Sequence, residues 1–381
     1  MARHRLSGSA VIAGIGHTTF GAHPGRLPTS MIVEATAAAL LDAGIEKGMV
    51  DAVLVKPPTS NPEMMFQVGV SEALGIQPKL NPNWNQGGAA NVAMLSYAAM
   101  AIDAGMCEVA LVCFADNPKT GSRQAFNRAK GNDAVFGHFG VLGSYGMIAR
   151  RHIEQYGTST DHLGAVAVAC RRHGASNPNA QLRKPLTLDE YRASRPLIAP
   201  FRREDACLVS DGGAALVVMS AKRAKELGVR KPVPMLGFGQ GQSAWDYSLW
   251  PDMTTTKATV SAQMAFDMAG LGPDDIDVAQ LYDCFTIVPI MTLEDYGFCK
   301  KGEGGPFAAE GRLEIDGDLP MNTSGGLLSE TGMPGMQLII EGVRQMRGEA
   351  TLQAKKSRTC IVANQGGIMQ THGTLILGQP Q

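Results

Sequence analysis

Short apolar runs alternate with helix-period stretches along the first part of the chain. Ala10–Ile15 and Val109–Phe114 are compact apolar runs, a pattern typical of buried strands. Met31–Ala43 is rich in alanine with helical spacing and stops at Gly44, a favourable residue just past a helix end. Val92–Ala104 is so rich in alanine and methionine that we expect a helix buried all round. This alternation predicts an α/β fold.

The later part of the chain shows the same alternation. Val278–Tyr282 reads as a strand, and a helix is expected within Asp283–Tyr296. Leu338–Met346 has the spacing of an amphipathic helix. The last strands are predicted at Cys360–Asn364 and Thr374–Leu377, joined by a glycine-rich loop over 365–373.

The second half of the chain repeats the first. Four short segments return in the same order: Gly14-Ile15-Gly16 as Gly237-Phe238-Gly239, Ala43-Gly44-Ile45 as Ala269-Gly270-Leu271, Val50-Asp51 as Ile276-Asp277, and Gly87-Gly88 as Gly325-Gly326. The repeated unit is therefore a whole half-domain. We expect two halves, residues 1–230 and 231–381, with the paired Gly-Gly turns pointing into the cleft between them.

Residues 116–205 have no counterpart in the second half and are interpreted as an insertion in the first. Arginine is frequent there, and its guanidinium group forms bidentate contacts with phosphates. The segment is either a cap that holds an anionic group such as a nucleotide phosphate or a solvated surface. The arginines of this segment include Arg123, Arg128, Arg150, Arg151, Arg171, Arg172, Arg183, Arg195, Arg202 and Arg203.

Composition narrows the function classes. The 381 residues are 44% hydrophobic and 18% charged, with a formal net charge of −1, so a basic surface for nucleic acid or membrane is not expected. No apolar run approaches the roughly 20 residues of a membrane span. The seven cysteines have neither metal-ligand nor redox spacing. We therefore expect a cytoplasmic protein with reduced thiols, no metal site and no bound cofactor.

Several motifs together resemble the thiolase superfamily, in particular its sterol-carrier-protein type. They are the two Gly-Gly turns, Leu281-Tyr282-Asp283-Cys284-Phe285, Ser210-Asp211-Gly212-Gly213, Asn322-Thr323-Ser324-Gly325-Gly326-Leu327-Leu328 and the last glycine-rich loop. The resemblance covers nearly the whole chain. It implies a five-layer αβαβα fold with two pseudo-symmetric halves, a tight homodimer and a coenzyme A thioester as substrate.

The chain departs from a working thiolase at its catalytic positions. The resemblance places a nucleophilic cysteine at the first Gly-Gly turn, where this chain has Gly88 or Gly87. Gly332 stands where the family has an activating histidine, and the second acid/base cysteine near the last glycine-rich loop is also missing. Acyl transfer of the thiolase kind therefore lacks its nucleophile.

What remains is a scaffold that could hold an enolate on a thioester oxygen. Amide groups at helix N-termini and glycine turns are suited to this. The expected positions are Gly87, Gly88, Asn91, Gly325, Gly326, Gly332, Gly366 and Gly367. Similar proteins that lack the cysteine include aldolases that remove the side chain of steroid acyl-CoA esters, and these are thought to use two tyrosines. Tyr282 matches the first, while the second would fall at Gly332.

The candidate catalytic side chains are Tyr282, Asp283 and His372. Tyr282 is either a proton shuttle or a core tyrosine with a buried hydroxyl. Asp283 follows it and favours a structural role. His372 lies in the predicted last loop, as a base or as a surface histidine, and His138 is a weaker candidate.

The leading hypothesis is retro-aldol cleavage of a bulky 3-hydroxyacyl-CoA, together with a small OB-fold, zinc-ribbon partner in a heterotetramer. One alternative is an acyltransferase that uses another residue, such as Cys284. The other is a non-catalytic subunit that binds acyl-CoA.

Overall fold

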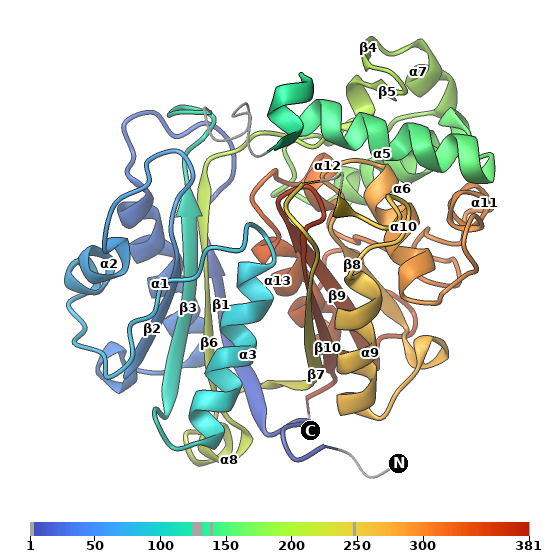
Figure 1. Ribbon diagram of the computed structural model, residues 1–381. Coiled ribbons are helices and arrows are strands. Elements are labelled where there is room, and N and C mark those ends of the chain that lie inside the picture. The colour runs from blue at the N-terminus through green and yellow to red at the C-terminus, as the bar shows by residue number, and fades with distance from the viewer. Residues whose placement is uncertain (1–3, 124–131, 138–139, 247–248, 381) are drawn as a thin grey trace.

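The computed structural model of the protein describes residues 4–123, 132–137, 140–246 and 249–380 (Figure 1). The strands are β1 (Ala10–His17), β2 (Ala52–Lys56), β3 (Val109–Asp116), β4 (Pro196–Ile198), β5 (Phe201–Arg202), β6 (Gly212–Ser220), β7 (Val233–Gln242), β8 (Val278–Leu281), β9 (Thr359–Gly366) and β10 (Thr371–Gly378). The helices are α1 (Pro28–Ala43), α2 (Phe66–Leu74), α3 (Ala90–Asp103), α5 (Gly140–Tyr156), α6 (Thr160–Ser176), α7 (Leu188–Ala193), α8 (Ala221–Glu226), α9 (Ala258–Ala269), α10 (Ile287–Asp295), α11 (Gly304–Ala309), α12 (Gly326–Ser329) and α13 (Met336–Arg347).

The large sheet has the strand order β2-β3-β6-β1-β7-β10-β9-β8. Its two halves meet at β1 and β7 through the pairs Val11 with Pro234 and Ile12 with Val233. Read outward from this junction, β1, β6, β3 and β2 correspond to β7, β10, β9 and β8. In both halves the outermost pair is parallel and the inner pairs are antiparallel. The predicted pseudo-symmetry of two halves is confirmed.

Helices and the two half-sheets form five layers. Helix α1 covers β1 and β6 on one outer face, and α9 covers β7 and β10 on the other. Helices α3 and α13 lie between the half-sheets and contact strands of both (Figure 1). This arrangement confirms the αβαβα fold that the sequence predicted. No helix among the described residues combines the length and apolar character needed to cross a membrane.

The repeated Gly-x-Gly segments allow the outer helices to lie directly on the strands. A Cβ atom on Gly14 or Gly16 would stand 2.2 Å from a carbonyl oxygen of α1. On Gly237 or Gly239 it would stand 2.1 Å from a carbonyl oxygen of α9. Glycine in a strand marks such a close backbone approach, so one packing constraint, used twice, explains this part of the sequence repeat.

The repeated Ala-Gly pairs end the two outer helices. Gly44 follows α1 with φ 67°, and Gly270 follows α9 with φ 66°. Glycine takes this left-handed conformation without steric cost, which makes it the usual residue after a helix end. The repeat therefore encodes equivalent helix ends in both halves.

The long connection between β3 and β6 forms a separate group of elements over one end of the molecule, which we call the cap. It contains α5, α6, α7 and the small β4–β5 sheet. In Figure 1 it lies at the upper right, and α6 packs against α11 and α12 of the second half. The corresponding connection, between β9 and β10, is a short turn.

The last two strands are longer than the sequence predicted. The ladder continues from Cys360 with Leu377 to Gly366 with Thr371, so the connecting loop shrinks to a tight turn. His372 therefore lies within β10, paired with Gln365, and the expectation that it sits in a glycine-rich loop is wrong. The backbone hydrogen bonds of a regular ladder outweigh the loop-forming tendency of the glycines.

Helix α13 is buried on its polar side as well as its apolar side. Glu341 accepts a hydrogen bond from the Thr323 hydroxyl at 2.6 Å, and the Gln345 amide donates to the same hydroxyl at 2.8 Å. The polar side of this amphipathic helix thus faces protein in the central layer, where Glu341 and Gln345 find hydrogen-bond partners.

Candidate active site

Tyr282 lies directly after β8 and presses against the first Gly-Gly turn. A Cβ atom on Gly88 would stand 2.6 Å from Cε2 of the tyrosine ring and 2.9 Å from its hydroxyl oxygen. The side chain of Tyr282 is buried, with 9% of its surface exposed. No hydrogen bond to its hydroxyl is formed within the described part of the chain. The phenol therefore occupies the space into which a side chain at position 88 would project.

The turn beside the phenol leads into the central helix α3. Gly87 takes a positive φ of 57°, and α3 begins at Ala90 without a side-chain cap. The N-terminus of a helix carries partial positive charge and favours a nearby anion. The hydroxyl of Tyr282 and the start of α3 thus both lie next to Gly88.

Burial raises the pKa of Tyr282 well above its ordinary value, and Cys284, Cys207 and Asp283 add to the effect. The phenol is therefore protonated at neutral pH and can donate a hydrogen bond. Burial also raises the pKa of the Cys284 thiol well above its usual range. Cys284 is therefore a neutral thiol rather than a nucleophilic thiolate.

The last glycine-rich turn closes on the first Gly-Gly turn. A Cβ atom on Gly366 would lie 1.9 Å from the Gln86 carbonyl oxygen, and one on Gly87 would lie 2.6 Å from Cα of Gly366. The Thr371 hydroxyl also donates to the Gln86 carbonyl at 3.0 Å. The two turns are thus in backbone contact, and Gly367 lies with them.

Asn91 sits in the first turn of α3 and is fully buried. Its side-chain amide donates to the carbonyl of Pro334, which joins α3 to the segment before α13. Its Oδ1 atom has no partner among the described residues, and the same holds for Oδ1 of Asn364. Two buried amide oxygens near one junction leave capacity for a donor from water or substrate.

Asp283 supports the second Gly-Gly turn. Its carboxylate accepts hydrogen bonds from the backbone of Leu327 at 2.7 Å and of Leu328 at 3.2 Å, at the start of α12. A Cβ atom on Gly326 would lie 2.3 Å from Oδ2 of Asp283. Burial raises the pKa of Asp283 to about 6. Tyr282 and Asp283 therefore face different turns, the tyrosine the first and the aspartate the second.

Gly332 has no room for a side chain. A Cβ atom there would stand 1.7 Å from the carbonyl oxygen of Leu208, and its backbone N–H donates to the Ser210 hydroxyl at 3.0 Å. A histidine or tyrosine at this position would require the backbone to move. The departure seen in the sequence is thus built into the local packing.

His372 is not brought to Tyr282. His372 and Thr374 lie on the same face of β10, and the Thr374 hydroxyl contacts Ser261 of α9. Gly373, which lies between His372 and Thr374 in the strand, faces α3 on the opposite side. The Nε2 atom of the His372 ring lies 2.9 Å from the Met369 carbonyl, and burial lowers the pKa of His372 to about 4. The ring borders a hollow of about 140 Å³, which is also lined by Thr371 and by Gln86, the residue before the first Gly-Gly turn.

Sequence reasoning missed Tyr145 and Gln365 as site residues. Tyr145 of α5 is 1% exposed, and the Gln365 amide donates to its hydroxyl at 2.5 Å and to Sγ of Cys284 at 3.2 Å. Stacking of Phe285 on Tyr145, at 4.6 Å between ring centroids, places α5 over the Tyr282 segment. A tyrosine in a distant helix carries no local signal for this contact.

Part of the predicted arginine set is paired within the protein. Arg171 contacts Glu204, and Arg172 lies 2.8 Å from Glu314. Arg151, Arg183 and Arg195 are exposed. Arg128 and His138 lie outside the described residues.

Glu330 is a buried carboxyl beside the second turn, with 1% of its surface exposed. It accepts hydrogen bonds from the Ser324 hydroxyl at 2.7 Å and from the Asn177 amide, at the end of α6, at 3.1 Å. Burial raises the pKa of Glu330 to about 7, and Glu341 contributes in the same direction. The group therefore holds a proton in the folded protein at weakly acidic pH.

Comparisons with known proteins identify relatives of this chain. A family model described as "Thiolase C-terminal domain-like" matches residues 239–379. The "Steroid side-chain-cleaving aldolase" of Thermomonospora curvata is 36% identical, over 98% of each chain. The "17-hydroxy-3-oxo-4-pregnene-20-carboxyl-CoA lyase" of Mycobacterium tuberculosis is 37% identical, over 90% of this chain and 92% of that protein.

Solved structures give the same relationship. The chain is similar to a structure named "Ltp2-ChsH2(DUF35) aldolase", with a TM-score of 0.89, 35% identity and coverage of 98% of both chains. An acetyl-CoA acetyltransferase from Syntrophomonas wolfei shares the fold, with a TM-score of 0.71 and 15% identity over 97% of this chain and 99% of that one.

A methyl group at position 88 is expected to displace Tyr282. Gly88→Ala should lower kcat by about 100-fold, because ångström-scale misplacement of a reacting group has effects of that size. Gly143→Ala is the matched control, since among the described residues no atom beyond its chain neighbours and its own helix lies within 4 Å of its added Cβ. Steady-state kinetics of both variants test this; a Gly88→Ala enzyme with wild-type kcat would contradict the contact.

Glu330→Gln is expected to stabilise the protein at pH 8 but not at pH 5. A carboxyl whose pKa is raised on folding contributes stability below its unfolded pKa and loses that contribution as pH rises through its folded pKa, here about 7. The melting temperature of Glu330→Gln should therefore gain about 4 °C on wild type between pH 5 and 8. Glu46→Gln, at an exposed site, should show a constant difference; a constant difference for Glu330→Gln would contradict the assignment.

Proposed function

The chain belongs to the thiolase superfamily, and we propose that within it this protein is an acyl-CoA aldolase, a carbon–carbon lyase. Its reaction is retro-aldol cleavage of a bulky 3-hydroxyacyl-CoA, with a coenzyme A thioester as substrate and no bound cofactor. The observation that carries this proposal is the phenol of Tyr282 beside Gly88, where a thiolase would need a thiol.

The cleavage needs a base, an oxyanion site and an acid. The base takes the proton of the β-hydroxyl, the bond between the α and β carbons breaks, and its electron pair enters the thioester enolate. The β carbon becomes the carbonyl of a ketone or aldehyde, and the enolate takes a proton at its α carbon. Backbone amides near Gly87 and Gly88 at the start of α3 would hold the enolate oxygen. Tyr282, protonated at neutral pH, would supply the proton.

Acyl transfer is disfavoured by the state of the thiols. Cys284 and Cys207 near Tyr282 both have pKa values raised by burial. A thiol must ionise before it can accept an acyl group. Retro-aldol cleavage needs no acyl-enzyme and is compatible with these neutral thiols.

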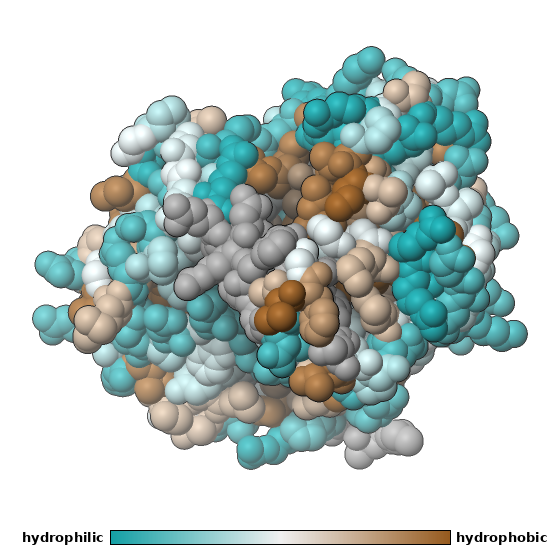
Figure 2. All heavy atoms as spheres, turned by 45° about the horizontal axis from the view of Figure 1, so that its top comes forward, coloured by the Kyte–Doolittle hydropathy of each residue, from teal (hydrophilic) through white to brown (hydrophobic). Residues whose placement is uncertain are grey.

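Exposed apolar side chains on two neighbouring loops support a substrate with a bulky ring or aryl group. Val135 and Phe136 are 83% and 86% exposed, and Leu249 is 66% exposed. The loops that carry them are linked by a hydrogen bond from the Asn132 backbone to Asp246 at 3.4 Å. Figure 2 shows apolar residues gathered on the face that carries the cap. The exposed Arg151, Arg183 and Arg195 of the cap are candidates for contacts with the phosphates of coenzyme A.

The assembly we propose is a homodimer with two copies of a small OB-fold, zinc-ribbon subunit, in the cytoplasm. The similar aldolase structure is named with a second component, ChsH2(DUF35), which supports a partner subunit. Co-expression followed by light scattering on the purified complex tests the heterotetramer.

Tyr282→Phe is expected to abolish most of the cleavage. Loss of a general acid lowers kcat by about 100-fold or more, while the ring and its packing against Gly88 remain. The enzyme with its partner is incubated with ring-bearing 3-hydroxyacyl-CoA esters, and the ketone and shortened acyl-CoA are measured by mass spectrometry. Wild-type activity in Tyr282→Phe, or no cleavage of any ester by the wild-type complex, would refute the proposal.

His372→Gln tests whether the histidine acts as the base. Its position on the opposite face of β10 leads us to expect kcat within about threefold of wild type. A base in direct contact with substrate would instead cost about 100-fold. The same assay distinguishes these outcomes, and a 100-fold loss would restore His372 as the proton acceptor.

A further inference from the structure

Tyr145 contacts two segments near Tyr282: the last glycine-rich turn and the residues that follow Tyr282 in the chain. Its hydroxyl accepts a hydrogen bond from the Gln365 amide, next to the last glycine-rich turn. Its ring stacks on Phe285, which follows Tyr282 in the chain by three residues, with an interplanar angle of 28°. A side chain from the cap thus bridges the turn on one side and the tyrosine segment on the other.

Gln365 connects Tyr145 to the first Gly-Gly turn. Its Oε1 atom accepts a hydrogen bond from the Met369 backbone at 2.8 Å, which closes the turn between β9 and β10. Its carbonyl oxygen would lie 2.5 Å from a Cβ atom on Gly88. Gln365 and the ring of Tyr282 therefore lie against the same residue, Gly88, and a shift of Gln365 would change the position of the turn on which Tyr282 packs.

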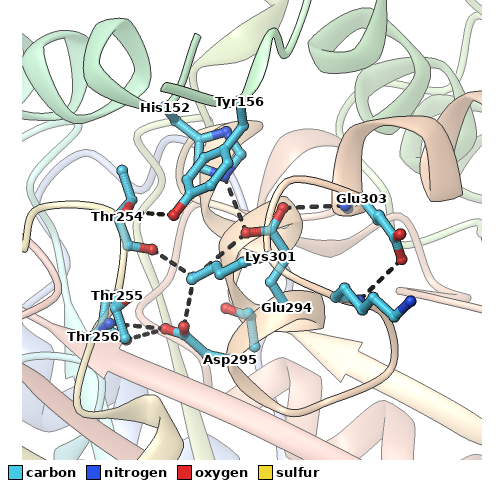
Figure 3. Close-up of polar contacts among 12 residues, drawn as sticks. His152, Tyr156, Thr254, Thr255, Thr256, Glu294, Asp295, Lys301 and Glu303 are labelled. Carbon is cyan, nitrogen blue, oxygen red and sulfur yellow. Dashed lines mark hydrogen bonds and ion pairs between the residues drawn. The ribbon is translucent and has the colours of Figure 1, made fainter. Parts of the chain in front are cut away.

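The other end of α5 is anchored by a buried polar cluster, shown in Figure 3. His152 lies about two helical turns beyond Tyr145, on the same face of α5, and its Nε2 atom is 3.1 Å from Glu294 of α10. Lys301 lies 2.7 Å from Asp295 and 3.4 Å from Glu294. With both ends held, α5 presents Tyr145 at a defined position.

We propose that Tyr145 is a positioning residue, whose hydroxyl holds Gln365 so that Tyr282 stays aligned with the first Gly-Gly turn. This inference rests on the proposed function, because alignment of Tyr282 matters only if its proton is transferred. The cap would then take part in catalysis through one side chain in addition to covering the site.

Tyr145→Phe is expected to lower kcat about tenfold with KM within about twofold, as a displaced support for a reacting group does. The stack on Phe285 is retained, so the melting temperature should fall by only about 2 °C. Tyr296→Phe is the matched control, because it also loses a buried hydroxyl contact, with Thr374 at 2.5 Å, but on the outer face. It should show a similar melting temperature and wild-type kcat.

A double-mutant cycle tests the route through Gln365. If Tyr145 acts through the amide, Tyr145→Phe combined with Gln365→Leu should be no slower than Gln365→Leu alone. Additive losses, wild-type kcat in Tyr145→Phe, or an equal loss in Tyr296→Phe would each overturn the proposal.

Hydrogen exchange separates this proposal from the proposed function. Amides of residues 365–369 should exchange about tenfold faster in Tyr145→Phe and unchanged in Tyr296→Phe. Faster exchange in Tyr145→Phe, found together with a wild-type complex that cleaves no ester, would support the contact and refute only the aldolase assignment. Unchanged exchange in Tyr145→Phe would refute the positioning role itself.

Discussion

Beside the start of α3, the ring of Tyr282 occupies the volume that a side chain at position 88 would need. A Cβ atom at position 88 would stand 2.6 Å from the ring, so the phenol and any side chain there exclude each other. The same turn is closed from the other side by Gln86 against Gly366. This mutual exclusion decides the chemistry at position 88. A protonated phenol lies where acyl transfer would need a thiol.

The two halves of the fold are connected through neighbouring residues of one short segment. Tyr282 packs on the first Gly-Gly turn, while Asp283 binds the backbone at the start of α12 in the second. Because successive residues of an extended chain point to opposite sides, a single strand end can serve both turns. Burial of Asp283 and Glu330 raises both carboxyl pKa values, to about 6 and about 7, which makes the stability of the folded protein depend on pH.

The cap is tied to the second half rather than to the half from which it extends. Gly174 of α6 lies against Gly325, and Asn177 binds Glu330. Tyr145 and His152 of α5 reach Gln365 and Glu294. These contacts between segments far apart in the chain give the cap a defined position over the site.

The α/β fold, its duplication and the absence of a thiol at the first Gly-Gly turn were determined by the sequence itself, since strand and helix periods, helix-ending glycines and residue identity are local properties. Tertiary structure decided what those residues face. It extended β10 through His372, because ladder pairing with Gln365 is a long-range contact. It left no room at Gly332, because Leu208 lies against it. It also brought Tyr145 to Gln365 across more than half the chain, a juxtaposition that only packing can specify.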